Sequence, residues 1–342
     1  MPDRLEDIAA AMVAPGKGIL AADESTGTIK KRFDTIGLES TEDNRRDYRE
    51  MLFRTEDAMQ NFISGVILFD ETIRQKAADG TPLVDIMRSH GSIPGIKVDK
   101  GAQDLALSPG EKVTEGLDGL RERLAEYHDL GARFAKWRAV ITIGDGMPTW
   151  ACENSNAHAL ARYASLCQEA GIVPIVEPEV LMDGPGMGHD IDRCYDVTHK
   201  ILRLVFRELH AANVSMDGMI LKPNMIIAGQ QCANQAGPEE VAEKTVKCLR
   251  DVVPSAVAGI AFLSGGQTDE QATHHLSLMN AGDDLPWPLT FSYGRALQAA
   301  AIKAWGGKKE NFAAGQRAFL HRARMNSMAA LGKWDTAQEQ AA

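Results

Sequence analysis

Short apolar segments recur along this chain, and each is followed by a polar or glycine-rich step and then by a longer stretch with helical periodicity. The segments are rich in β-branched residues and are apolar at almost every position. This pattern is typical of strands that are buried on both faces of a parallel sheet. It predicts eight strands, at residues 18–23, 65–70, 95–100, 134–140, 172–179, 218–224, 259–266 and 289–295.

Helix signals fill the stretches between these segments. Apolar residues recur at three- and four-residue spacing from Leu117 to Tyr127, and Gly131 is placed to end that helix. Pro238 predicts the start of a later helix, which Pro254 follows. Strand–helix alternation repeated eight times predicts a single-domain (β/α)8 TIM barrel over residues 1–342, with a short C-terminal tail from about residue 334. An open doubly wound sheet is the alternative, but its G-x-G-x-x-G motif does not follow the first segment.

The ends of the predicted strands are unusually polar. In TIM barrels the active site lies at the C-terminal ends of the strands, and phosphate often binds after strands seven and eight. Because a closed sheet brings these ends together, we expect their side chains to converge on one mouth. The polar ends carry Asp23, Lys97, Lys136, Glu177, Glu179, Lys222, Ser264-Gly265-Gly266 and Gly294-Arg295.

Two lysines lie in apolar strand segments. Lys222 lies near the end of the sixth segment. A purely structural alternative is that its side chain reaches from the barrel rim to solvent. Lys136 lies in the fourth segment, and a second cation lowers the pKa of a buried amine. An amine with a pKa of about 7–8 can attack a ketone and form an imine. The pattern indicates Schiff-base chemistry but leaves open which lysine is the nucleophile.

Three carboxylates accompany the lysines. Glu177 and Glu179 lie two residues apart, so they face the same side of their strand and can divide proton states between them. A solvated acidic rim is the alternative, and a metal site is disfavoured because no histidine follows ligand spacing. Asp23 ends the first strand and is either a general base or, together with Ser25, a candidate helix N-cap.

Glycine-rich turns follow strands seven and eight. Exposed glycine N–H groups and an arginine bind phosphate oxygens well, although a simple tight turn is the alternative for each loop. The first candidate phosphate site comprises Ser264, Gly265, Gly266, Ser292, Gly294 and Arg295. A second candidate anion site across the mouth comprises Ser25, Thr28, Arg32 and Lys97.

Composition narrows the function classes. The formal net charge of −10 argues against general binding to nucleic acid or to anionic membranes. The five cysteines are scattered and never form a C-x-x-C pair, which predicts free thiols and no zinc site. The chain shows neither a signal peptide nor a long apolar span, so we expect a cytoplasmic protein that binds no nucleic acid and no membrane.

With these residues in place, the chain resembles the class I fructose-1,6-bisphosphate aldolases in order from about Gly16 to about Lys333. The resemblance implies a metal- and cofactor-independent lyase of glycolysis and gluconeogenesis, which cleaves fructose 1,6-bisphosphate to dihydroxyacetone phosphate and glyceraldehyde 3-phosphate. It also implies a homotetramer. The matching segments are GKGILAADESTGT, GVILFDET, GIKVDKG, FAKWR, ARYASLCQEAGIVPIVEPE, MILKPNM, GIAFLSGGQ and FSYGRALQAAAIKAWGGKKEN.

The resemblance also implies a role for each matching residue. Lys222 matches the Schiff-base lysine, Lys136 the lysine that assists it, and Asp23 the base at the C4 hydroxyl. Glu177 matches the acid/base carboxylate of carbinolamine dehydration, with Glu179 beside it. The C1-phosphate side matches Ser264, Gly265, Gly294 and Arg295, with Ser292 close by, and the C6-phosphate side matches Ser25, Lys97 and Arg32. On the C6-phosphate side, Thr28 stands where the family commonly has a serine. Arg45 and Arg138 match positions that the family associates with substrate binding or with support of the site.

Two departures from the family pattern stand out. The family tail usually ends in a tyrosine that moves a proton to and from the enamine, whereas the last tyrosine here is Tyr293. The glycine-rich loop from Met182 to Gly188 is longer than usual and either covers the site or extends a surface turn. The alternatives to the aldolase are another Schiff-base enzyme such as a transaldolase, a metal-dependent aldolase, and a non-catalytic scaffold protein.

Overall fold

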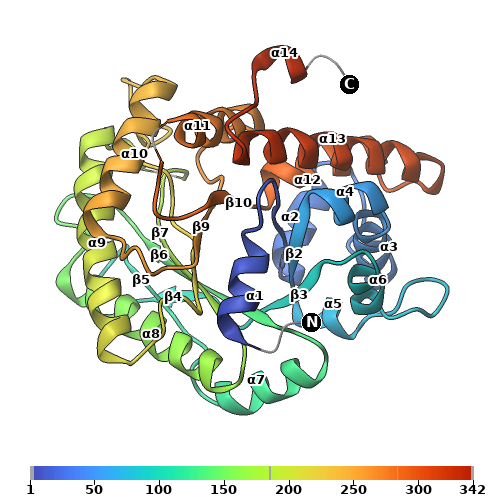
Figure 1. The fold of residues 1–342 in the computed structure, drawn as a ribbon, viewed down its shortest axis with the longest axis horizontal. Helices are drawn as coiled ribbons and strands as arrows, with labels where there is room; N and C mark the ends of the chain where they lie inside the picture. The colour runs from blue at the N-terminus through green and yellow to red at the C-terminus, as the bar shows by residue number, and fades with distance from the viewer. Residues whose placement is uncertain (1–3, 185, 283, 340–342) are drawn as a thin grey trace.

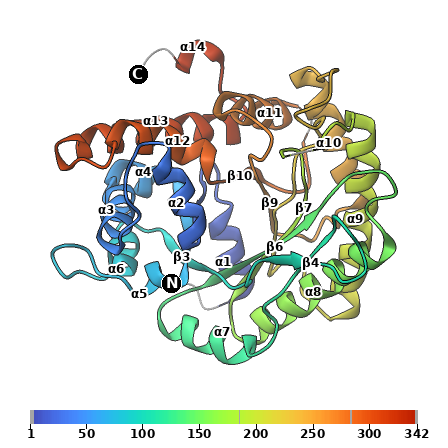
Figure 2. The same cartoon turned by 180° about the vertical axis from the view of Figure 1, so that it is seen from behind.

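The computed structural model describes residues 4–184, 186–282 and 284–339, so Pro185 of the glycine-rich loop and residues 340–342 of the tail lie outside it. Eight parallel strands close into a barrel in the order β1-β10-β9-β8-β7-β6-β3-β2. Helices surround this barrel in both views (Figures 1 and 2). The predicted (β/α)8 barrel is therefore confirmed, and the open sheet is wrong. The barrel strands are β1 (Gly18–Ala22), β2 (Ile63–Leu68), β3 (Ile93–Lys97), β6 (Phe134–Ile141), β7 (Val173–Val180), β8 (Ile220–Leu221), β9 (Gly259–Phe262) and β10 (Leu289–Tyr293).

The remaining elements are helical except for one small hairpin. That hairpin pairs β4 (Ala102–Asp104) with β5 (Lys112–Thr114) in antiparallel fashion. The helices before β7 are α1 (Leu5–Met12), α2 (Thr26–Asp34), α3 (Glu42–Phe53), α4 (Glu56–Asn61), α5 (Asp70–Arg74), α6 (Leu83–Ser89), α7 (Leu120–Asp129) and α8 (Trp150–Glu169). The later helices are α9 (Ile191–Ala211), α10 (Pro238–Val252), α11 (Asp269–Ala281), α12 (Arg295–Trp305), η1 (Lys309–Asn311), α13 (Phe312–Ala330) and α14 (Thr336–Glu339).

Local signals set several helix ends. Pro238 begins α10 as predicted, and Gly131 follows α7 with a φ of +103° that stops the helix. The predicted start of the α7 helix at Leu117 is wrong, because Gly119 adopts a left-handed φ of 65° and the helix begins at Leu120. A left-handed residue cannot belong to a right-handed helix.

A compact cluster of apolar side chains fills the interior of the barrel at its N-terminal end. The ring of Phe134 lies where Cβ atoms on Gly65 and Gly95 would stand, at 2.8 and 2.2 Å from its carbons. Val13, which follows α1, presses on Gly259 in the same way, at 2.7 Å. Bare glycines in three strands therefore let large side chains fill the lumen. This packing closes one end of the barrel and leaves the C-terminal mouth for chemistry.

The described part of the C-terminal tail packs on the barrel's outer helices (Figure 1). Trp334 is buried, and its indole N–H donates to the carboxylate of Glu339. The guanidinium of Arg322, on α13, donates to the same carboxylate at 2.7 Å. The five cysteines are free, as predicted. None of the described helices has both the length and the apolar character that a bilayer span requires.

Candidate active site

One cavity of about 650 Å³ opens at the C-terminal ends of the strands. It brings together every residue of the predicted site except Gly266 and Arg45. The strand-end side chains therefore converge on one mouth, as expected, because the closed barrel brings the C-terminal ends of its strands together. The predicted residues that line the cavity are Asp23, Ser25, Thr28, Arg32, Lys97, Lys136, Arg138, Glu177, Glu179, Lys222, Ser264, Gly265, Ser292, Gly294 and Arg295.

Glu177 lies between the two lysines. Its two carboxylate oxygens stand 3.2 Å from Nζ of Lys222 and 3.5 Å from Nζ of Lys136. Both lysine side chains are 5% exposed, so neither reaches solvent from the rim. Lys222 follows β8 directly, and its N–H still donates to the Val176 carbonyl of β7 at 2.8 Å. This hydrogen bond holds the lysine in the register that places its amine over Glu177.

Asp23 faces the same lysines. Nζ of Lys136 lies 2.7 Å from its carboxylate. Burial raises the pKa of Asp23, but the charges of Lys136 and Lys222 outweigh burial and hold that pKa at about 2. Burial also lowers the pKa of Lys136, and Asp23 with Glu177 reverses this effect and raises it. Ser25, rather than Asp23, occupies the N-cap position of α2. The general-base interpretation of Asp23 is the one that this geometry supports.

Glu179 has a different partner from Glu177. It lies in an ion pair with Nε of Arg138, which β6 presents beside it. Burial lowers the pKa of Arg138, and the Glu179 carboxylate more than offsets it, so the guanidinium pKa is raised. Of the two carboxylates, Glu177 is therefore the one that can exchange protons with the Lys222 amine.

The two candidate phosphate sites draw on different strand ends around the same cavity, the first on β9 and β10 and the second on β1, α2 and β3. The buried hydroxyl of Ser292, in β10, has no hydrogen-bond partner among the described residues. It lines the cavity together with Gly265, which follows β9. Arg295 begins α12, and its guanidinium donates to Asp183 at 2.6 Å. Its N–H donors and that hydroxyl form one polar wall of the cavity.

The second candidate site is also rich in hydroxyl groups and cations. The hydroxyls of Ser25 and Thr28 lie 3.1 Å apart, so they can bind one ligand together. Lys97 pairs with Asp99 at 2.7 Å and Arg32 pairs with Glu24 at 2.5 Å.

Three charged residues that the sequence pattern did not predict also line the cavity, Glu24, Lys31 and Asp99. Asp99 had a usable signal, because it lies two residues after Lys97 at the same strand end and such residues share a face. Glu24 follows Asp23 directly and gave no comparable sign. It is nonetheless buried, where it pairs with Arg32 and, at 3.6 Å, with Arg49.

Two predicted residues lie outside the cavity. Arg45 donates to both carboxylate oxygens of Glu71 and to the Ser40 carbonyl, which favours the supporting role over substrate contact. Gly266 adopts a φ of +75°, and a Cβ there would stand 2.5 Å from Cβ of Met182. It supports the turn by its lack of a side chain rather than by lining the site.

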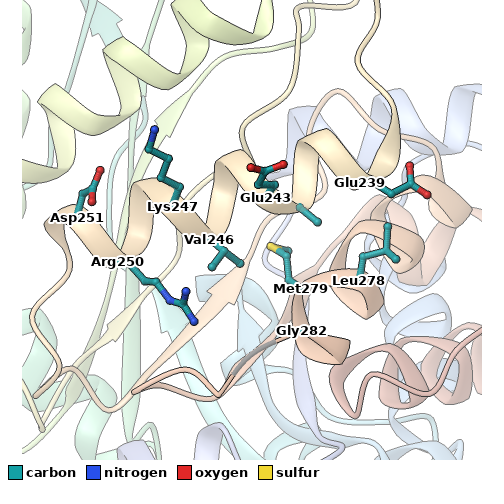
Figure 3. A pocket seen from close by; sticks show the side chains of 10 residues that line it. Glu239, Glu243, Val246, Lys247, Arg250, Asp251, Leu278, Met279 and Gly282 are labelled. Carbon is teal, nitrogen blue, oxygen red and sulfur yellow. The ribbon is translucent and has the colours of Figure 1, made fainter.

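A second hollow, of about 550 Å³, lies between α10 and α11 (Figure 3). Its floor includes Val246, Leu278 and Met279, and charged side chains such as Glu239 and Lys247 flank it. None of the predicted site residues lines this hollow. The barrel mouth is therefore the candidate active site.

Comparison with known proteins agrees with this geometry. The sequence family described as fructose-bisphosphate aldolase class-I matches residues 4–342. A probable class 1 fructose-bisphosphate aldolase of Xanthomonas axonopodis pv. citri is 60% identical, over 97% of this chain and 98% of that protein. The fructose-bisphosphate aldolase of Drosophila melanogaster is 54% identical, over 98% and 92%.

A solved structure extends the likeness to three dimensions. It is the fructose-bisphosphate aldolase of Plasmodium falciparum, in complex with TRAP and a small-molecule inhibitor. It superimposes with a TM-score of 0.94 at 50% identity, covering 97% of this chain and 95% of that one. This chain belongs to the class I fructose-bisphosphate aldolase family.

Proposed function

We propose that this protein reversibly cleaves fructose 1,6-bisphosphate to dihydroxyacetone phosphate and glyceraldehyde 3-phosphate through a Schiff base on Lys222. The observation that carries the assignment is the buried array in which Glu177 contacts both Lys222 and Lys136, and Lys136 contacts Asp23. Family membership supports the substrate and the reaction. The same membership favours Lys222 over Lys136 as the nucleophile, a choice that the residue pattern alone left open.

Imine formation uses Lys222 and Glu177. The unprotonated amine of Lys222 attacks the C2 carbonyl and forms a carbinolamine. Glu177, whose carboxyl oxygen lies 3.2 Å from that amine, donates a proton to the departing hydroxyl, so that water leaves and a protonated imine remains. Lys136 stands 3.5 Å from the other oxygen of the same carboxylate, so Glu177 contacts both amines.

Carbon–carbon cleavage uses Asp23. Its pKa of about 2 keeps it ionised, so it can take the proton of the C4 hydroxyl. The C3–C4 bond then breaks, its electron pair moves toward the imine to form an enamine, and glyceraldehyde 3-phosphate leaves. Protonation of the enamine at C3 and hydrolysis release dihydroxyacetone phosphate and restore Lys222.

Two groups of anion-binding residues in one cavity suit a substrate with a phosphate at each end. Ser264, Gly265, Gly294 and Arg295 are assigned to the C1 phosphate, with Ser292 close by. Ser25, Thr28, Arg32 and Lys97 are assigned to the C6 phosphate. This pairing favours a bisphosphate aldolase over a transaldolase.

The test combines a cleavage assay with covalent trapping. Fructose 1,6-bisphosphate should be cleaved in the presence of a chelator, and borohydride with dihydroxyacetone phosphate should label Lys222 and abolish activity. The Lys222→Ala variant should be neither labelled nor active. Activity lost to the chelator would indicate a metal-dependent enzyme, and labelling at Lys136 would reverse the lysine roles. A folded protein with neither turnover nor labelling would favour the scaffold alternative.

We also propose a cytoplasmic homotetramer. Family resemblance supports the assembly, and the name of a 53% identical relative from Arabidopsis thaliana, a cytosolic aldolase, supports the location. Analytical ultracentrifugation should give four times the mass of one chain. A dimer or monomer at micromolar concentration would refute the assembly, and fractionation of cells would test the location.

A further inference from the structure

An ion pair bridges the rim of the active site on its C1-phosphate side. Arg295, the first residue of α12, donates from Nη2 to Oδ2 of Asp183 at 2.6 Å. Asp183 follows β7, whereas Arg295 follows β10, and strands β8 and β9 lie between these two in the barrel. The pair therefore spans the stretch of rim from which Ser264 and Gly265 line the cavity.

The carboxylate of Asp183 occupies Arg295 in the way that a phosphate group would. Carboxylate and phosphate both accept parallel hydrogen bonds from a guanidinium, so they compete for the same donors. The N-terminus of α12, where Arg295 lies, favours either anion by its dipole. The Arg295 side chain is 58% exposed and that of Asp183 is 26% exposed. An incoming phosphate can therefore reach the guanidinium while Asp183 still holds it.

The backbone on both sides of Asp183 is anchored. The Met182 carbonyl accepts from the N–H of Gln230 at 2.8 Å, and the Gly186 N–H donates to the Gln231 side chain at 3.2 Å. Met182 also packs against Gly266, because a Cβ added to Gly266 would stand only 2.5 Å from the Cβ of Met182. Asp183 is thus fixed beside the phosphate loop by neighbours that do not include Arg295. Release of the arginine requires only that the carboxylate side chain turn away.

We propose that Asp183 sets the affinity for the substrate's C1 phosphate by holding Arg295 in the free enzyme and competing with the phosphate for it. This inference rests on the proposed function, because that function assigns Arg295 to the C1 phosphate. The phosphate must displace Asp183, so binding is weaker than Arg295 alone would give. Asp183 of the glycine-rich loop is, on this view, part of the binding site.

The direct test measures the affinity for inorganic phosphate by isothermal titration calorimetry. Asp183→Asn keeps the shape of the side chain and removes its charge. It should tighten phosphate binding about two- to five-fold, the range expected for loss of a partly exposed ion pair. Asp192→Asn is the matched control, because Asp192 pairs with Lys244 on the outer surface and the variant makes the same change in net charge. It should leave the dissociation constant unchanged.

A double-variant experiment tests whether the change in phosphate affinity acts through Arg295. In Arg295→Gln the C6-side anion site remains, and adding Asp183→Asn there should not change phosphate binding. Asp183→Glu keeps the charge and should stay closer to the wild type than Asp183→Asn. In kinetics, Asp183→Asn should lower the KM for fructose 1,6-bisphosphate by the same two- to five-fold factor. The value of kcat should hardly move.

Two results would overturn the proposal. Unchanged phosphate affinity in Asp183→Asn would mean that Asp183 does not compete. Weaker binding would mean that it orients Arg295 for phosphate instead. The calorimetry does not depend on turnover. If wild-type protein shows neither cleavage nor borohydride trapping, the proposed function fails, while the competition for Arg295 is still measured.

Discussion

Lys136 and Asp23 form an ion pair of 2.7 Å across the mouth of the barrel. Strands β2 and β3 separate β1, which Asp23 follows, from β6, which carries Lys136. The pair therefore reaches across the lumen instead of running along the rim. It holds the carboxylate ionised and keeps it beside the array of Lys222 and Glu177 that we assign to imine chemistry.

Asp23→Asn should separate the two halves of the reaction. Cleavage of fructose 1,6-bisphosphate should fall by about 10²–10⁴-fold, because an amide cannot take the C4 hydroxyl proton. Borohydride trapping of dihydroxyacetone phosphate at Lys222 should persist, because attack at C2 needs no base at C4. The exposed Asp57 on α4 supplies a control variant, Asp57→Asn. Loss of trapping together with cleavage would show that Asp23 acts earlier, in imine formation.

Glu177→Gln should slow imine formation, and Glu179→Gln should do so less. Glu177 contacts both lysine amines, whereas Glu179 is paired with Arg138. Stopped-flow mixing with dihydroxyacetone phosphate and borohydride quenching should show a rate about 100-fold lower for Glu177→Gln. Equal losses in the two variants would contradict the division of roles between these carboxylates.

The contribution of Asp23 to stability should change with pH only in acid. The pKa of Asp23 in the folded protein, about 2, lies below the usual value of about 3.9 for an unfolded aspartate. Its ionised form therefore stabilises the fold at every pH above about 4, and this contribution declines as the pH falls from about 4 to about 2. Urea unfolding of the wild type and Asp23→Asn from pH 7 down should show a difference that narrows in that window. A difference that instead changed between pH 5 and 8 would contradict the assignment.

Arg45→Gln should affect stability rather than substrate binding. The side chain of Arg45 is occupied by Glu71 and the Ser40 carbonyl, away from the cavity. Losing these charged hydrogen bonds should lower the free energy of unfolding by about 1–3 kcal/mol. The KM for fructose 1,6-bisphosphate should stay within about twofold of the wild type, since no cavity contact is lost. A large rise in KM at unchanged stability would assign a binding role to Arg45 instead.

The strands show how far the local sequence pattern could predict the fold. All eight predicted strands exist, but the predicted strand 218–224 contains only Ile220–Leu221 of β8. The backbone beyond Leu221 leaves the regular ladder to carry Lys222 and Asn224, whose amide oxygen accepts from the N–H of Val180 at 3.0 Å. An apolar run shows that a strand is buried, but the geometry of its neighbours decides how far the ladder extends.

By itself the sequence determined the alternation of strands and helices, the barrel, and the residue types at its mouth. Apolar periodicity, prolines and strand-end residues are local properties that can be read along the chain. Only the tertiary structure decided the partner of each charged group. Glu177 lies with the lysines, Arg45 with Glu71, and Arg295 with Asp183. The physical reason is that these pairs join strands and helices far apart in sequence, and the energy of a charge depends on distances that exist only once the barrel has closed.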